Sequence, residues 1–221
     1  MERHRRDKLW GYEDWLYDDR KLLLKRLCAD KRLSVQVHPN EDTAKTVGGR
    51  AKAEMLHVMK GGPIFAGFRP GVTHEDVVRA VKDGTFEEIL VRFDAKAGEC
   101  YFIPGGLVHA IGEGTVVFEV QQSSDTTFRL YDWGRVDAQG RARTLHVKEA
   151  LAAMDVALPP PVPEKSASCA YFDFRRHDAG ELQPCDRHRV IYDPVADAVS
   201  DLAPLASARF ANPVFAVSLN S

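Results

Sequence analysis

The sequence predicts an all-β sandwich or barrel that carries one helical insert. Three observations lead to this fold class. Short segments with strand-like alternation recur along the chain, glycine and proline turns separate them, and one stretch has helical spacing instead. Many short strands joined by such turns are typical of sandwiches and barrels. With 221 residues the chain can form one substantial domain, or one domain with a small appendage.

The first part of the chain contains one clear strand. Residues 1–21 are charged, with tryptophans and tyrosines interleaved, as expected of an edge segment that packs aromatic rings onto a core. The apolar run at 21–27 fits either a strand or a helix. The segment RLSVQVHP at 32–39 alternates on a two-residue period and ends at Pro39–Asn40, so it predicts a strand. Residues 40–54 read as a loop or a short helix.

Alternation in this strand places unusual polar residues together. Leu33, Val35 and Val37 are expected on one face, because successive side chains of a strand point to opposite sides. The other face would carry a hydroxyl, an amide and an imidazole, from Ser34, Gln36 and His38.

The helical insert spans about residues 73–91. Two strands are expected before it, within 53–69, around Gly61–Gly62–Pro63. Thr73 and Asp76 have the spacing of a capping box, which marks a helix start. Gly84 would end this helix, and apolar residues that follow indicate a second short one.

Strand-like alternation returns after the insert and continues to about residue 133. Residues 99–133 contain turns at 104–106 and 112–114 between apolar runs, and residues 144–155 read as a helix. We therefore expect a domain at 1–156, a proline-rich linker at 157–163 and a short C-terminal segment at 164–221. The last segment alternates only weakly.

Composition excludes several partners. The net charge of −2 gives no basic field that would hold nucleic acid or an anionic membrane. No apolar run approaches the roughly 20 residues that span a bilayer, and the charged start lacks the apolar core of a secretory signal. Four widely spaced cysteines are typical of reduced thiols, so a cytoplasmic protein is expected.

Four residues could form a metal site. Gln36 and His38 share a strand face, Glu54 begins the next expected strand, and His109 follows a Pro-Gly-Gly turn. Two imidazoles, a carboxylate and an amide oxygen suit zinc or a similar divalent ion with one position open. Spacing alone favours the alternative, a barrel in which Gln36 and His38 only form hydrogen bonds, with Glu54 and His109 on the surface.

A second polar stretch lies at 118–133. Glu119 and Gln121 are two residues apart, so they would share one strand face. Asp125 and Arg129 fall on the same two-residue period and would continue that face. A buried carboxylate and guanidinium are costly unless paired or used, but a solvated sheet face would explain the same pattern. Lys25, Lys52 and Arg129 could contact a phosphate, although each alone is typical of a surface charge.

Taken together, these stretches resemble the type I phosphomannose isomerases (mannose-6-phosphate isomerases), which are zinc enzymes with a cupin, or jelly-roll, fold. The resemblance covers roughly residues 21–155. It rests on LLLKRLCADKRLSVQVHPNED, AKAEMLHVM, GECYFIPGGLVHAIGEG, VVFEVQQSSDTTFRLYDWGR and RTLHVKEAL, in the family's order and spacing. The run ending at His109 also resembles the second cupin motif, with Glu99 where aspartate is usual. Family members usually run to 300 residues or more, so a shortened member with a reduced or missing second β-domain is expected.

The resemblance implies a site and a reaction. One Zn²⁺ per chain would be held by Gln36, His38, Glu54 and His109. Catalytic residues would be Arg129 and Glu119, the latter as general base. Residues facing the sugar phosphate would be Lys25, Ser34, Lys52 and Asp125. The implied reaction interconverts mannose 6-phosphate and fructose 6-phosphate through an enediol, in a monomeric cytoplasmic enzyme.

Two other functions are open to the same fold. A metal- and sugar-binding cupin without turnover, with a regulatory role, would fit the shortened chain. Another cupin activity, such as an epimerase or dioxygenase, is disfavoured, because oxygenases use a His-x-His pair for iron and this chain has Gln36 at the first of those positions.

Overall fold

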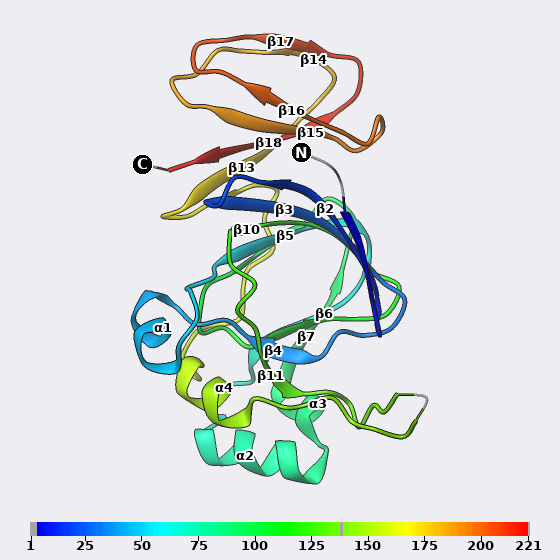
Figure 1. The fold of residues 1–221 in the computed structure, drawn as a ribbon, viewed down its shortest axis with the longest axis vertical. Coiled ribbons are helices and arrows are strands. Elements are labelled where there is room, and N and C mark those ends of the chain that lie inside the picture. Colours follow the sequence, from blue (N-terminus) through cyan, green and yellow to red (C-terminus); the bar gives the residue numbers. More distant parts are fainter. Residues whose placement is uncertain (1–3, 138, 221) are drawn as a thin grey trace.

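The computed structural model describes residues 4–137 and 139–220, and it confirms a predominantly β fold. Two antiparallel sheets form a sandwich that encloses the candidate site (Figure 1). The first sheet has the strand order β1 (His4–Lys8), β2 (Gly11–Asp18), β3 (Leu22–Ala29), β10 (Val116–Gln122), β5 (Glu54–Lys60) and β8 (Cys100–Ile103). The second has the order β11 (Phe128–Tyr131), β4 (Val35–Val37), β9 (His109–Ile111), β6 (Gly62–Phe68) and β7 (Leu90–Ala95).

Apolar side chains from both sheets fill one part of the sandwich interior. Leu56 and Val117 of the first sheet and Ile64 and Ile111 of the second belong to one buried cluster. The ambiguous run at 21–27 forms most of β3, where Leu23, Leu24 and Leu27 are buried. Burial of apolar surface of this kind is the main favourable contribution to folding.

Helices cover the outer face of the second sheet, as Figure 1 shows. They are α2 (His74–Asp83), α3 (Phe86–Ile89) and α4 (Val147–Ala153), whereas α1 (Glu41–Val47) lies at the side of the sandwich. The expected capping box is present at α2: the Thr73 hydroxyl accepts from the Asp76 N–H, the Asp76 carboxylate accepts from the Thr73 N–H, and Gly84 ends the helix in the left-handed region. Val77 and Phe86 pack with Val35 and Val37, so the apolar side of β4 faces the helices.

The strand at 33–38 is shorter than expected. It begins only at Val35, and Leu33 belongs to the interior cluster instead of sharing the outer face of Val35 and Val37. The Leu33 N–H donates to the carbonyl of Ile111, which fixes this residue outside the regular ladder. Leu33, Ser34 and Gln36 therefore all line a cavity inside the sandwich, which is described below with the candidate site.

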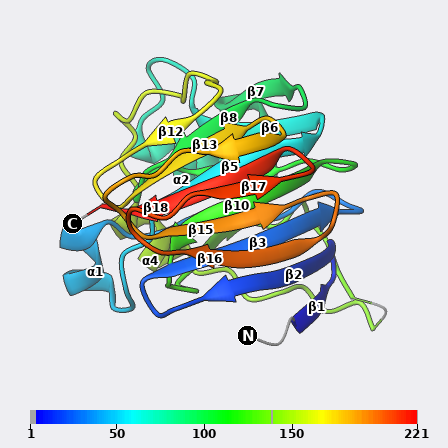
Figure 2. The same ribbon diagram turned by 90° about the horizontal axis from the view of Figure 1, so that it is seen from above.

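The C-terminal segment forms more regular structure than its weak alternation predicts. A third sheet has the order β12 (Ala167–Ser168), β13 (Phe172–His177), β18 (Val214–Leu219), β15 (Arg189–Asp193) and β16 (Ala198–Leu202), and a fourth pairs β14 (Gly180–Leu182) with β17 (Ala208–Phe210). Figure 2 shows the third sheet lying over the first.

Aromatic rings join the third sheet to the first. Phe118 of β10 stacks on Tyr192 with ring centroids 5.0 Å apart and nearly parallel planes, and it also contacts Phe174 and Phe215. Aromatic pairs of this geometry contribute more to stability than the area they bury would alone.

No helix of the described residues is long and apolar enough to cross a membrane.

His57 is buried at the same junction. Its ring contacts Phe174 and Phe215, and its Nδ1 lies 3.2 Å from the Cys100 sulfur. Burial, with a smaller contribution from Arg176, lowers the pKa of His57 to about 4. The folded protein therefore holds this imidazole neutral, because burial and the positive charge of Arg176 both disfavour an imidazolium.

We expect acid to destabilise the fold through His57. The unfolded chain binds the proton near pH 6.5 and the folded chain near pH 4, so stability is fully present above pH 6.5 and falls as the pH drops through this window. Between pH 7 and pH 5 the loss in unfolding free energy should be about 2 kcal/mol. Urea unfolding at both pH values should give a loss that is about 2 kcal/mol smaller in His57→Leu than in the wild type and in the control His188→Gln, which alters an exposed imidazole. Equal losses in all three proteins would exclude His57 as the cause.

Candidate metal centre and active site

The four candidate ligands converge inside the sandwich from both sheets. Gln36 of β4 is paired with His109 of β9 in the second sheet, and His38 directly follows β4. Glu54 begins β5 in the first sheet and faces them across the interior. His38, Glu54 and His109 are each about 1% exposed, so the alternative of surface positions for Glu54 and His109 is wrong.

A close backbone approach fixes the two histidines relative to each other. The Pro-Gly-Gly turn before His109 lies against the chain after His38, and the Gly106 N–H donates to the His38 carbonyl at 2.7 Å. A Cβ added at Gly105 would lie only 2.7 Å from the Pro39 oxygen, so this position requires glycine.

The ligand atoms face one another. His109 Nε2 lies 2.9 Å from Glu54 Oε1, and His38 Nε2 lies 3.4 Å from Glu54 Oε2. One ligand atom from each of these three residues lies within 4.8 Å of the others. The Gln36 amide completes the set at 3.4 Å from His109 Nε2, with its nitrogen on that side. Amide oxygen and nitrogen are assigned by their surroundings, so the oxygen can take the same place.

Hydrogen bonds on the far side of each imidazole set the tautomer. His38 Nδ1 lies 2.9 Å from the Thr126 carbonyl, and His109 Nδ1 lies 3.0 Å from the Leu107 carbonyl. A carbonyl only accepts, so both Nδ1 atoms carry the proton and both Nε2 lone pairs point toward Glu54. Hydrogen bonds of this kind, from the ring nitrogen that does not bind the ion, orient metal-ligating histidines.

Electrostatics favour the protonation states in which His38 and Glu54 can bind a metal ion, a neutral imidazole and an ionised carboxylate. Burial, together with the neighbouring Lys52, lowers the pKa of His38 to about 3, so the imidazole is neutral. Burial alone would raise the pKa of Glu54, but Lys52, His38 and His109 outweigh it and hold the pKa well below its usual range. A buried carboxylate facing two imidazoles is a donor set that fits Zn²⁺.

Lys52 brings a positive charge to the same centre. Its ammonium lies 2.7 Å from Glu54 Oε2 and 3.2 Å from His38 Nε2, and it is 3.9 Å from the Glu119 carboxylate. Glu54 Oε2 is buried and makes no hydrogen bond of good geometry within the described part of the chain. The Lys52 ammonium, at 2.7 Å, is the cation that neutralises this oxygen. A bound metal ion would compete with Lys52 for Glu54 Oε2 and His38 Nε2.

A cavity of about 270 Å³ opens beside the ligands. It brings together Gln36 and all six residues expected to contact substrate or do chemistry, which are Lys25, Ser34, Lys52, Glu119, Asp125 and Arg129. Asp125 is exposed at its rim, whereas Lys25, Ser34 and Glu119 are buried. Arg129 donates through Nη1 to the Thr144 carbonyl at 2.8 Å, and its buried Nε has no hydrogen-bond partner among the described residues.

Glu119 and Lys25 form the buried charge pair of this cavity. Their Oε1 and Nζ atoms are 3.2 Å apart. Burial raises the pKa of Glu119, with Glu54 acting in the same direction and the two lysines opposing it. A carboxyl group tuned upward in this way can hold and release a proton closer to neutral pH.

Sequence reasoning missed part of the cavity wall. Glu13 and Trp15 of β2 line it, as do Arg6 of β1 and Arg143. Trp15 donates to Glu13 at 2.9 Å, and the Lys25 ammonium lies 5.2 Å from the Trp15 ring centroid. The interleaved aromatics at 1–21 were the available signal, but they indicated an edge segment and not a cavity wall.

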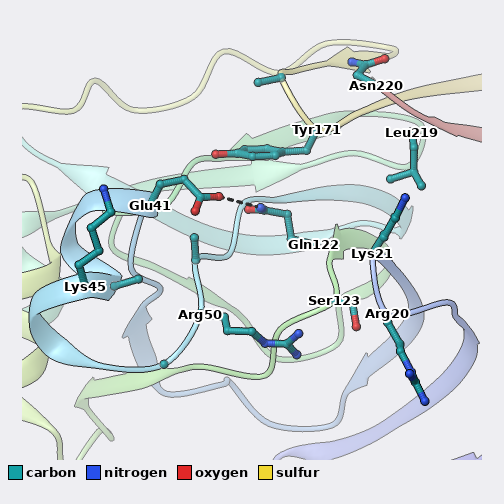
Figure 3. A pocket seen from close by; sticks show the side chains of 14 residues that line it. Arg20, Lys21, Glu41, Lys45, Arg50, Gln122, Ser123, Tyr171, Leu219 and Asn220 are labelled. Carbon is teal, nitrogen blue, oxygen red and sulfur yellow. Dashed lines mark hydrogen bonds between the residues drawn. The ribbon is translucent and has the colours of Figure 1, made fainter.

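A larger cavity, about 600 Å³, lies elsewhere (Figure 3). It lies between α1, the start of β3 and the C-terminal strand, and exposed cations such as Arg20, Lys21 and Arg50 border it. Its Glu41 carboxylate already accepts from the Gln122 amide. None of the candidate metal ligands lines this cavity, so the smaller one is the candidate active site.

Comparison with known proteins confirms the resemblance. The chain is 38% identical over 168 residues to mannose-6-phosphate isomerase ManA of Bacillus subtilis, which is 72% of this chain and 52% of that protein. It is 37% identical over 142 residues to the mannose-6-phosphate isomerase of Streptococcus mutans, covering 62% of this chain and 45% of that one. The chain thus spans about half the length of these curated relatives. No family model matches it.

Solved structures show the same fold. The mannose 6-phosphate isomerase from Bacillus subtilis matches with a TM-score of 0.76 at 20% identity, covering 99% of this chain and 96% of that chain. A zinc-bound mannose 6-phosphate isomerase matches with a TM-score of 0.56 at 15% identity, covering 91% and 79%.

The metal centre predicts a direct loss of zinc on mutation. His38→Ala and His109→Ala each remove one of the two candidate imidazole ligands, so zinc retained after dialysis should fall from about one per chain to a small fraction of that. His188→Ala, which changes an exposed imidazole, is the matched control. Metal analysis of the dialysed proteins is the measurement, and zinc content in both variants equal to the control would rule out this centre.

Proposed function

We propose that this relative of the mannose-6-phosphate isomerases is a zinc-dependent aldose–ketose isomerase that interconverts mannose 6-phosphate and fructose 6-phosphate. One observation carries the proposal: a buried His–Glu–His centre is in contact with Gln36 and Lys52, and these two residues line a cavity that also holds a buried carboxylate of raised pKa. The reaction needs electrophilic stabilisation of substrate oxygens and a positioned base, and this cavity contains residues suited to both tasks.

Gln36, His38, Glu54 and His109 would hold the ion. When bound there, it would act as a Lewis acid on the carbonyl and hydroxyl oxygens at C1 and C2 of the sugar. The zinc-bound isomerase of matching fold supports this choice of metal.

Glu119 is the proposed general base. It would take the proton from C2 of the open-chain aldose, leaving an enediolate. A proton would then pass from the oxygen on C2 to the oxygen on C1 by way of the enediol, and Glu119 would return its proton to C1 to give the ketose. Its raised pKa supports this role, because both protonation states must be accessible in one turnover. Lys25, at 3.2 Å, would hold the carboxylate in place and stabilise its charged form.

The cations divide between the two ends of the substrate. Lys52 contacts the candidate ligands, so we assign it to the oxygens at the reacting end. Arg129 would bind the phosphate or the developing enediolate, because its Nε is buried in the cavity without a partner among the described residues. Arg143 is already held by Asp132 through two bonds of 2.7 and 2.6 Å, so it is less free to bind substrate.

A second candidate function follows from the length of the chain. Because it spans about half of its curated relatives, it could bind metal and sugar phosphate without turning substrate over, in a regulatory role. A coupled assay that follows fructose 6-phosphate formation from mannose 6-phosphate separates the two functions. Turnover in the purified chain supports the isomerase, and binding without turnover supports the alternative.

Glu119→Gln should remove the base while leaving the metal centre in place. We expect kcat to fall by about 10²-fold or more, with zinc content unchanged. The control Glu113→Gln alters an exposed carboxylate and should keep full kcat. The coupled assay and metal analysis are the measurements. If kcat is unchanged in Glu119→Gln, another group is the base.

Arg129→Ala should weaken substrate and transition-state binding. Loss of a charge-assisted contact to phosphate or enediolate is expected to lower kcat/KM by about tenfold or more. Arg141→Ala, at an exposed arginine, is the control. Steady-state kinetics would reject the assignment if Arg129→Ala retained the kcat/KM of the control.

A further inference from the structure

A second charged cavity lies in the C-terminal sheet, apart from the metal centre. Its volume is about 200 Å³. Its lining comes from β13, β15, β18 and the segment before β15 and consists of Asp173, Arg175, His177, Cys185, Arg187, Arg189, Ala216 and Ser218. These strand residues alternate with Phe174, Val190, Phe215 and Val217, which pack toward the first sheet. The cavity is therefore on the face of the third sheet that points away from the sandwich.

Strand register builds a floor of small residues between two cationic strands. Ser218 of the central strand β18 is paired with Asp173 on one side and with Arg189 on the other. The next position of β18 on the same face, Ala216, is paired with Arg175. Because side chains at alternate positions share a face, the long arginines rise on both sides of the short Ser218 and Ala216 side chains.

Positive charge exceeds negative charge in this cavity. Three guanidiniums line it, against the single carboxylate of Asp173, which is already ion-paired with Arg187. Within the described residues, neither Arg175 nor Arg189 forms an ion pair with a carboxylate. The same positive charge affects His177. Burial, followed by the charges of Arg189 and Arg175, lowers the pKa of its imidazole.

Arg189 is the decisive residue. It is only 7% exposed, and its Nη2 donates to the Ala206 carbonyl at 3.1 Å. Its Nε is buried and has no hydrogen-bond partner in the described chain. A buried guanidinium is costly unless an anion neutralises it and its donors are satisfied. An anion in the adjoining cavity would satisfy both requirements.

We propose that this cavity is a binding site for a small tetrahedral oxyanion, either inorganic phosphate or the phosphoryl group of a phosphate monoester. Arg189 and Arg175 would supply charge-assisted hydrogen bonds, and the Ser218 hydroxyl would donate from the floor. Guanidinium forks match phosphate geometry. The volume admits a phosphoryl group with a few further atoms. The site does not depend on the isomerase proposal, because it shares no residue with the metal cavity.

Calorimetric titration of the full chain with inorganic phosphate tests the site. Arg189→Met and Arg175→Gln should each weaken this binding by about tenfold or more, the effect of losing one charge-assisted bond. Arg176→Gln, on the neighbouring exposed position of β13, is the matched control. Arg129→Ala removes the phosphate contact assigned to the metal cavity, so binding that survives in this variant belongs to the C-terminal site.

Folding is checked separately. Arg175 is exposed, so Arg175→Gln should keep the wild-type thermal midpoint. Arg189→Met removes an unpaired buried charge, so its midpoint in phosphate-free buffer should equal or exceed that of the wild type. Phosphate should raise the midpoint of the wild type and have a much smaller effect on both variants.

The outcomes are distinct. The proposal is overturned if Arg175→Gln, Arg189→Met and the wild type bind phosphate with the same affinity. It is also overturned if only Arg129→Ala abolishes binding, or if the wild type does not bind phosphate. If glycerol 2-phosphate competes with inorganic phosphate, the ligand is a monoester, and if it is excluded, the ligand is the free anion. Isomerase turnover is not part of the readout, so a failure of the catalytic proposal leaves this result interpretable.

Discussion

The contact on which the structure depends is the buried carboxylate of Glu54 between two imidazoles. It joins β5 of the first sheet to the ends of β4 and β9 in the second, with His109 at 2.9 Å and His38 at 3.4 Å. A buried carboxylate is expensive unless positive or donor groups surround it. Lys52 meets this need, and a metal ion would meet it with the same atoms. The electrostatic requirement of one residue therefore fixes both how the sheets meet and where chemistry can occur.

Strand β10 connects that centre to the rest of the molecule. Glu119 points into the cavity beside Lys25, while the preceding Phe118 stacks on Tyr192 of the C-terminal sheet. Two-residue periodicity thus lets one strand carry the candidate base on one face and the main aromatic junction on the other. The C-terminal sheet closes the outer face of the first sheet, which would otherwise expose Phe118 and the buried His57 to water.

Local patterns were sufficient for the features that depend on neighbours in sequence. Alternation placed Gln36 and His38 on one face, and the capping residues Thr73 and Asp76 marked the start of α2. Patterns failed where the outcome depends on distant partners. The strands at 164–221 carry outward charges, and only packing of Phe174 and Phe215 against the first sheet reveals their apolar face. Likewise, no local signal placed Trp15 on the cavity wall, because its position beside Lys25 follows from the register between β2 and β3.

The central claim is that the buried His–Glu–His centre holds a zinc ion needed for isomerisation. The most direct measurement is turnover of mannose 6-phosphate by the purified chain before chelation, after chelation and after zinc is added back. The account predicts turnover that is lost with the metal and restored by stoichiometric zinc. Full turnover in protein shown by metal analysis to be free of divalent ions would contradict it.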